Sequence, residues 1–426
     1  MSTWFRLWFP LFGLSPACSW RVPRSHPAPE TVVFIVLDTV RSETTSLCGE
    51  SRPTTPVLRE LVEDGWAWTC DATAPGTWTT PSHVSFFTGK PVVELDGGRF
   101  VPAPADTLTG QFAARGFRTA MVAANMVLAK PDWLAAGFEH SRIAKNFAEL
   151  DGMALADAVG DALNSVKATD ALFLFVNIAD AHAPYPAVPE GVVWAQPQRP
   201  VQHRMWSTDL EIPFHRYVSG RMPDTEAPEF RAQLDNGYAW AVSQADRTLG
   251  LVLARLASHG RNQRLRVVIT SDHGEFVGEH GQVGHGDTLY EQGQRVPLLY
   301  FDNDGPEPNL GDRIDARYAF HLLRDGELPM PLDPPTSVAF FQPSPRTSFN
   351  GAATWNGATK TVWRAGTWER YDLASDPSEL HPVPITPDLS TEQFRNTVAE
   401  HLATIATLNE PDNETTQNLR AAGYVE

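Results

Sequence analysis

Three near-continuous apolar runs stand out along this chain of 426 residues. They cover residues 31–37, 171–178 and 266–270, and they are rich in β-branched and aromatic side chains. Short apolar runs of this composition predict strands that are buried on both faces, as in a parallel sheet. The pattern therefore indicates a sheet covered by other elements on each side.

Other stretches follow the three-to-four-residue spacing of helices. Thr55 and Pro56 predict a helix start, and Gly65 predicts its end. Residues 108–116 predict a short helix before a strand at 118–123, and residues 235–258 predict the longest helix. Strands that alternate with helices predict an α/β fold: a doubly wound, mostly parallel sheet flanked by helices.

Each apolar run ends in polar residues that can bind a metal ion. Asp38 follows the first run, Asp180 and His182 follow the second, and Asp272 and His273 follow the third. Carboxylates and imidazoles are ligands of divalent cations, and ligands bind at the carboxyl ends of strands in open α/β sheets. This convergence predicts a metallohydrolase site.

Two regions depart from this alternation. Residues 183–234 are rich in proline and contain large aromatic side chains, among them Trp194, Trp206, Phe214 and Tyr217, which predicts either a rim over the site or a loop that simply packs down. After about residue 335, two strands at 359–363 and 367–371 and a helix near 391–408 predict a small C-terminal antiparallel α+β subdomain, so the catalytic unit is expected to span 31–335 and the subdomain 336–426.

Composition limits the classes of partner. The apolar fraction of 42% excludes a disordered chain, and the formal net charge of −17 argues against an extended nucleic-acid surface. A small anionic ester could still bind where cations focus the field. We therefore expect a small-molecule substrate and no nucleic acid, while the oligomeric state is left open.

The amino-terminal segment predicts export. Arg6 precedes an apolar run at 7–14, which is typical of a secretion signal and too short to span a bilayer. Cys18 follows a small residue, as in lipoprotein signals, so residues 1–20 predict a leader with a possible membrane tether, residues 21–30 a linker, and the location an exported, periplasmic or membrane-anchored one. The alternative is an apolar leader without such a role. The other two cysteines, Cys48 and Cys70, could pair in an oxidising compartment, but we expect two core thiols.

A candidate nucleophile lies between the first two ligand strands. Pro81 suits the first turn of a helix, so Thr79 is expected at the amino end of that helix, where free amides favour an anion. A hydroxyl bound there to a cation becomes a usable nucleophile at neutral pH, whereas a threonine without a metal would be a simple helix cap.

At this point the chain resembles the sulfatase-like branch of the alkaline phosphatase/sulfatase superfamily. The resemblance covers about residues 31–426 and rests on the order and spacing of several segments. These segments are Val36–Arg41, Arg52–Gly65, Thr79–Gly89, Asp180–Tyr185, Ser271–Pro297 and Tyr371–Glu379. It implies one or two divalent metal ions (Ca, Mn, Zn or Mg).

The resemblance also implies roles for individual residues. Asp38, Thr79, Asp272 and His273 would bind the first metal. His182 and His285 would contact the transferred oxyanion or, with Asp180, a second cation. His83 would either hydrogen-bond near the nucleophile or pack in the first helical turn. Glu275 and His280 would orient other ligands.

Two departures from the sulfatase pattern affect the expected chemistry. Sulfatases have Cys or Ser at the nucleophile position, which is converted to formylglycine, and an Arg four residues later. This chain has Thr79 and His83 there, and Ala124-Asn125-Met126 in place of a Lys-Trp-His segment. Threonine cannot be oxidised to that aldehyde by the same route. In this respect the chain is similar to the family members that keep threonine, which are nucleotide pyrophosphatase/phosphodiesterases and lipid-headgroup phosphotransferases.

We therefore expect a metal-dependent hydrolase with Thr79 as nucleophile, preferring phosphodiesters or phosphonates to sulfate esters. The alternatives are a true sulfatase, a phospho-headgroup transferase and, last, a non-catalytic binding protein.

Overall fold

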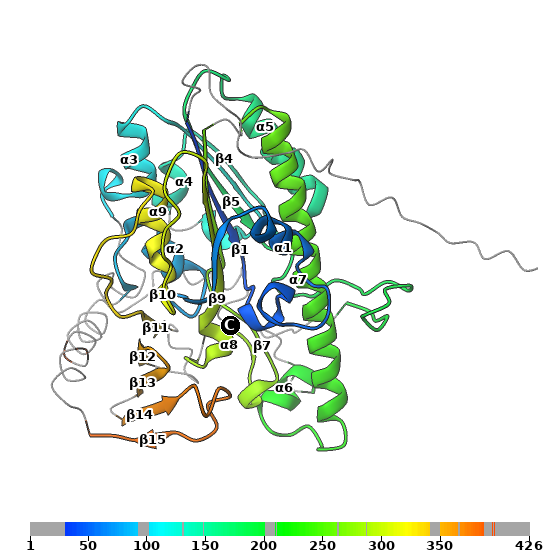
Figure 1. Ribbon diagram of the computed structural model, residues 1–426. Helices are drawn as coiled ribbons and strands as arrows, with labels where there is room; N and C mark the ends of the chain where they lie inside the picture. The colour runs from blue at the N-terminus through cyan, green and yellow to red at the C-terminus, as the bar shows by residue number, and fades with distance from the viewer. Residues whose placement is uncertain are drawn as a thin grey trace, which may run out of the picture.

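The computed structural model describes residues 30–92, 102–129, 132–147, 149–200, 209, 211–261, 264–286, 288–340, 350–364, 367–386, 394 and 396. An eight-stranded sheet lies between two layers of helices, with a smaller sheet beside it (Figure 1). The helices are α1 (Pro56–Glu63), α2 (Thr79–Thr88), α3 (Leu108–Ala114), α4 (Asp132–Ala136), α5 (Gly152–Asn164), α6 (Pro213–Val218), α7 (Ala227–Ser258), α8 (Glu291–Gln294) and α9 (Ala319–Asp325). The strands are β1 (Thr31–Leu37), β2 (Ala67–Thr73), β3 (Arg118–Ala123), β4 (His140–Ile143), β5 (Leu172–Ile178), β6 (Leu265–Thr270), β7 (Phe276–Val277), β8 (Val283–Gly284), β9 (Arg295–Asp302), β10 (Ile314–Asp315), β11 (Thr336–Phe340), β12 (Asn350–Asn356), β13 (Thr359–Arg364), β14 (Thr367–Asp372) and β15 (Val383–Pro384).

The order of strands in the large sheet is β10-β2-β9-β6-β1-β5-β3-β4. All neighbours pair in parallel except β9, which runs antiparallel to both β6 and β2. The mostly parallel α/β prediction is therefore confirmed. Because β1 lies between β5 and β6, the three predicted ligand strands are neighbours and end at one edge of the sheet.

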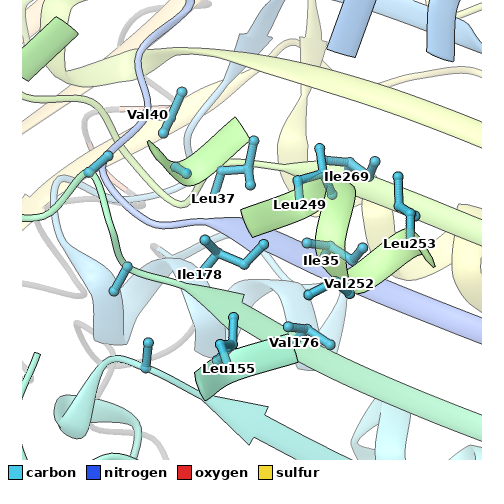
Figure 2. Packing of buried hydrophobic residues seen from close by; sticks show 14 of the residues in the cluster. Ile35, Leu37, Val40, Leu155, Val176, Ile178, Leu249, Val252, Leu253 and Ile269 are labelled. Carbon is cyan, nitrogen blue, oxygen red and sulfur yellow. The ribbon is translucent and has the colours of Figure 1, made fainter. Parts of the chain in front are cut away.

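The residues of β1 alternate between two cores. Val33, Ile35 and Leu37 face a cluster built with α1, α5 and α7, whereas Val32, Phe34 and Val36 face a cluster built with α2, α3, α4 and α9. Figure 2 shows the first cluster, where residues of the strands meet Leu155 from α5 and Leu249, Val252 and Leu253 from α7. Burying each such side chain contributes about 1.5–3 kcal/mol, which holds the strand ends in place.

The longest helix begins earlier than its apolar spacing predicted. Helix α7 starts at Ala227, so residues 227–234, which we expected within the rim segment, are helical. Pro228 suits the first turn, and Leu234 is buried, while the ring of Phe230 packs on Tyr217. The prediction missed this start because the first two turns of the helix are mostly exposed, and Leu234 is their one buried residue. Among the described residues, no helix is both long and apolar enough to cross a membrane.

The expectation of two core thiols is wrong. Cys48 and Cys70 form a disulfide, and their Cα atoms lie 5.7 Å apart. Helix α1 returns the chain so that β2 runs beside the loop that carries Cys48, which brings the Cα atoms within the ordinary range for a disulfide. The pairing depends on this return path, which the spacing of the two cysteines does not reveal.

The C-terminal region forms an antiparallel sheet, as predicted, but it has five strands, β11 to β15, of which the sequence predicted two, β13 and β14. A buried ion network joins it to α8: the Lys360 ammonium lies 3.1 Å from Glu291 Oε1 and 2.7 Å from Glu379 Oε1. The indole of Trp355 also donates to Glu291 Oε1. The predicted helix near 391–408 lies outside the described residues apart from 394 and 396, and the predicted leader and linker, Cys18 included, lie outside them almost entirely.

Candidate active site

The ends of β1 and β6 and the start of α2 meet at one buried point. Asp38 follows β1, Asp272 and His273 follow β6, and Thr79 is the first residue of α2. None of these four side chains is accessible to solvent. The structure therefore brings together the four residues that the resemblance assigned to the first metal.

Each of the two carboxylates has one oxygen bound by the protein and one that is not. Asp38 Oδ2 accepts hydrogen bonds from the side-chain amides of Asn125 and Asn177, both at 2.9 Å. Asp272 Oδ1 accepts from the backbone N–H groups of Thr39 and His273. Asp38 Oδ1 and Asp272 Oδ2 are buried without a hydrogen-bond partner, an arrangement that is costly unless a cation occupies the space between them.

His273 and Thr79 complete the set. The Nδ1–H of His273 donates to the carbonyl of Gly274, so Nε2 is the nitrogen with a lone pair. This Nε2 lies 3.4 Å from both Thr79 Oγ1 and Asp272 Oδ2. Ligand atoms of Asp38, Asp272 and His273 all lie within 4.8 Å of one another. The donor set therefore fits a divalent cation.

The electrostatics of the two carboxyls point the same way. Burial and the nearby Asp38 raise the pKa of Asp272 well above its usual range. Burial would also raise the pKa of Asp38, but neighbouring imidazoles and the two asparagine amides hold it below its ordinary value. Without a cation the pair thus favours a single negative charge, and a bound cation would allow both carboxyls to ionise.

His182 and His285 lie beside this centre. Their ring centroids are 5.2 Å apart, and the rings of His285 and His273 are 4.3 Å apart. His285 Nδ1 bonds to Glu275 Oε2 at 2.6 Å, and Tyr185 donates to the other oxygen of the same carboxylate. Since Nδ1–H of His182 donates to the carbonyl of Ala183, both rings present Nε2 as the acceptor nitrogen.

His83 contacts the backbone of Thr79, the expected nucleophile, rather than its hydroxyl. Its Nδ1–H donates to the carbonyl of Thr79 at 2.8 Å, and its ring meets Phe86 and Phe175 edge-on. Burial lowers the pKa of His83 to about 4, so the ring is neutral at neutral pH. This geometry favours packing in the first helical turn, one of the two roles we expected.

Asp180 turns away from the other ligands. Its Oδ1 accepts a hydrogen bond from Thr248 of α7, and burial raises its pKa to about 6. Its carboxylate is not part of the cluster of ligand atoms that Asp38, Asp272 and His273 form. The structure therefore gives no support to the expectation that Asp180 helps to hold a second cation. His280 stacks on Tyr290, whereas Glu275 orients His285 as predicted.

Sequence reasoning missed two asparagines. Asn125 donates through Nδ2 to Asp38 and also to Thr79 Oγ1 at 3.2 Å, while Asn177 supports both Asp38 and the backbone of Asn125. The available signal was an amide inside the apolar strand 172–178 and another just after the strand 118–123. A buried amide without a partner is costly, so an amide inside or just after an apolar strand was a signal that could have pointed to a specific partner.

Comparisons with known proteins agree with this fold. A family model described as Sulfatase matches residues 30–322. The structure is similar to a phosphonate monoester hydrolase of Agrobacterium radiobacter, with 17% identity, 89% of this chain and 96% of that chain covered and a TM-score of 0.59. It is similar to a 2-O GAG sulfatase, with 15% identity, coverage of 93% and 94% and a TM-score of 0.59. It is also similar to the C-terminal periplasmic domain of phosphoethanolamine transferase EptC from Campylobacter jejuni, with 17% identity, coverage of 66% and 81% and a TM-score of 0.50. No curated protein sequence matches the chain.

Proposed function

The chain belongs to the sulfatase family of ester hydrolases, and from this premise we propose that it cleaves phosphate diesters or phosphonate esters in preference to sulfate esters. The observation that carries the proposal is Thr79, whose hydroxyl is buried at the amino end of α2 next to Asn125 and His273. A threonine cannot become formylglycine, so the route that releases sulfate from that aldehyde is closed.

The chemistry of the covalent intermediate separates the two classes of substrate. Attack by Thr79 Oγ1 on phosphorus forms a Thr–O–P bond and breaks the bond to the leaving oxygen. Water can then attack phosphorus in line and release the threonine hydroxyl and the phosphate or phosphonate product. A sulfate ester of threonine cannot release sulfate by the elimination that formylglycine allows, and it would be hard to hydrolyse.

The surrounding residues have defined tasks in this cycle. Asn125 donates to Thr79 Oγ1 and fixes the direction of its lone pairs. His285, held at Nδ1 by Glu275, would relay protons at Nε2: it would take up the proton that the Thr79 hydroxyl loses and give it to the leaving oxygen. It would then take a proton from the attacking water and return it to Thr79 as the phosphorus bond breaks. A divalent cation held by Asp38, Asp272, His273 and Thr79 would lower the pKa of the nucleophile's hydroxyl and offset the charge of the transferred group.

A substrate panel with one common leaving group tests the proposal. The metal-loaded protein is assayed with four substrates that all release p-nitrophenol: a phosphate diester, a phosphonate ester, a phosphate monoester and a sulfate ester. Their kcat/KM values are compared. We expect the diester or the phosphonate to be turned over fastest. Thr79→Ala should lower the rate by about 10³-fold or more, and Thr79→Ser should retain part of it. A wide preference for aryl sulfate would contradict the proposal and favour a true sulfatase.

The same reaction separates hydrolase from transferase. With an added primary alcohol as acceptor, a hydrolase releases the phosphate monoester or the phosphonate, whereas a transferase forms a new ester with the alcohol in proportion to its concentration. We expect release to water to dominate.

We also propose that the protein is exported. The disulfide between Cys48 and Cys70 supports an oxidising compartment, in keeping with the leader expected at residues 1–20. Fusion of residues 1–30 to a reporter, followed by cell fractionation, tests this; a reporter that stays in the cytoplasm with an intact amino terminus would refute it.

A further inference from the structure

We propose that Asn177, together with Asn125, is a positioning residue that restricts Asp38 to a single ligand oxygen. This restriction makes the site select a four-coordinate cation such as Zn²⁺ over Ca²⁺. The inference rests on the proposed function for the identity of the metal ligands but not for the substrate.

The two asparagines form a closed chain of hydrogen bonds. Asn177 Nδ2 donates to Asp38 Oδ2 at 2.9 Å, and Asn177 Oδ1 accepts the backbone N–H of Asn125, also at 2.9 Å. Asn125 Nδ2 donates to the same Asp38 oxygen and to Thr79 Oγ1, while Asn125 Oδ1 accepts the backbone N–H of Val127. Both amides are fully buried, so neither group can exchange a partner for water.

This closed set of hydrogen bonds fixes the orientation of the Asp38 carboxylate. Two N–H donors converge on Oδ2, and rotation of the carboxylate would leave them unsatisfied in a buried site. Oδ1 is therefore the atom presented to a ligand. Asp272 is restricted in the same way, because two backbone N–H groups donate to Oδ1 and only Oδ2 remains available to a ligand.

The number and kind of donor atoms follow from this restriction. One oxygen from each aspartate, Nε2 of His273 and Oγ1 of Thr79 supply four donor atoms, one of them nitrogen. Four donors that include an imidazole suit Zn²⁺, whereas Ca²⁺ takes six to eight oxygens and often a carboxylate that binds through both. An Asp38 free to use both oxygens would weaken this preference.

Metal titration of the metal-depleted full-length protein tests the inference without any substrate. The dissociation constants for Zn²⁺ and Ca²⁺ are measured by chelator competition in wild type, Asn177→Ala and Asn177→Ser. We expect wild type to prefer Zn²⁺. Both variants should bind Zn²⁺ about 10–100-fold more weakly, with a smaller Zn²⁺/Ca²⁺ ratio. The matched control is Asn236→Ala. Asn236 lies in α7, its amide donates to the carbonyl of Gln196, and its loss should leave both dissociation constants unchanged.

Three results would overturn the inference. One is a wild-type protein that prefers Ca²⁺. Another is a folded Asn177 variant with unchanged constants. The third is a variant that loses thermal stability without metal but keeps the wild-type Zn²⁺/Ca²⁺ ratio, because the asparagine would then be structural only. If Asn177→Ala does not fold, Asn125→Ala removes the second donor from the adjoining loop and is held to the same expectation. A preference for aryl sulfates would refute the proposed substrate and leave these constants untouched.

Discussion

At the scale of single residues, the site is organised by which polar atoms the protein itself satisfies. Asp38 and Asp272 each give one oxygen to amide donors and keep one for a ligand. His273 and His182 give Nδ1–H to backbone carbonyls, which leaves Nε2 as the acceptor. Ligand atoms of Asp38, Asp272 and His273 lie within 4.8 Å of one another, which is how a protein prepares a cation site before the cation binds.

Asp272→Ala tests this organisation. The change removes one ligand oxygen and the oxygen that accepts the N–H groups of Thr39 and His273. We expect loss of bound metal and of activity, while the apolar core keeps most of the fold. Metal content by elemental analysis, with circular dichroism as the check on folding, measures both. An Asp272→Ala protein with unchanged metal content and turnover would exclude Asp272 as a ligand.

Glu275→Gln tests the support of His285. Glutamine keeps the shape of the side chain but removes the negative charge that holds Nδ1–H of His285. We expect kcat to fall about 10–100-fold with little change in KM. Tyr185→Phe is the matched control, because it removes the hydroxyl bound to the same carboxylate but keeps the charge, and its loss should be smaller. Equal effects of the two changes would argue against a role for the charge.

At the scale of elements, helix α1 is held by a carboxylate from α7. Asp246 accepts the backbone N–H groups of Val57 at 2.8 Å and of Leu58 at 3.0 Å, in the first turn of α1. Those donors favour the charged form, as does the helix amino end. Burial outweighs them and raises the pKa of Asp246 from 3.8 to about 7. The contact that joins the two helices is therefore sensitive to pH.

The sign of this effect follows from linkage. Because the folded state binds the proton more tightly than the unfolded state, the stability that Asp246 contributes is fully present below about pH 4. It is lost progressively as the pH rises to about 7, at about 1.4 kcal/mol per unit of pKa shift. Asp246→Asn should flatten the pH dependence of the free energy of unfolding in this window. Urea unfolding at a series of pH values measures it, and an identical slope in the variant would contradict the assignment.

At the scale of the whole molecule, the disulfide ties the loop that follows β1 to β2. Cys48 and Cys70 are 22 residues apart, and a cross-link that closes a loop of this length stabilises a protein by about 3 kcal/mol. We expect a reductant to lower the Tm of the wild-type protein. The same reductant should leave the Tm of a Cys48→Ser, Cys70→Ser double variant unchanged. Identical melting of the wild-type protein with and without reductant would contradict a disulfide in solution.

The local pattern of the chain was sufficient for the main architecture and for four site residues. Apolar runs that end in Asp38 and in Asp272-His273 predicted strands with ligands at their carboxyl ends, and Pro81 placed Thr79 at a helix start. The placement of these residues could be predicted because strand burial, helix starts and the residues at strand ends depend on positions adjacent in the chain. The second apolar run likewise ended in His182, and family resemblance then gave His182 a role and added His285.

Only the tertiary structure decided which distant groups meet. The partners of Asn177 and Asn125, the turn of Asp180 toward Thr248, and the pairing of Cys48 with Cys70 all depend on strand order and on how helices return the chain. No periodicity encodes these contacts, since they join residues from about 20 to more than 130 positions apart. Sequence by itself therefore determined the fold class and the ligand types, whereas three-dimensional packing decided which oxygen of each carboxylate is left for a ligand.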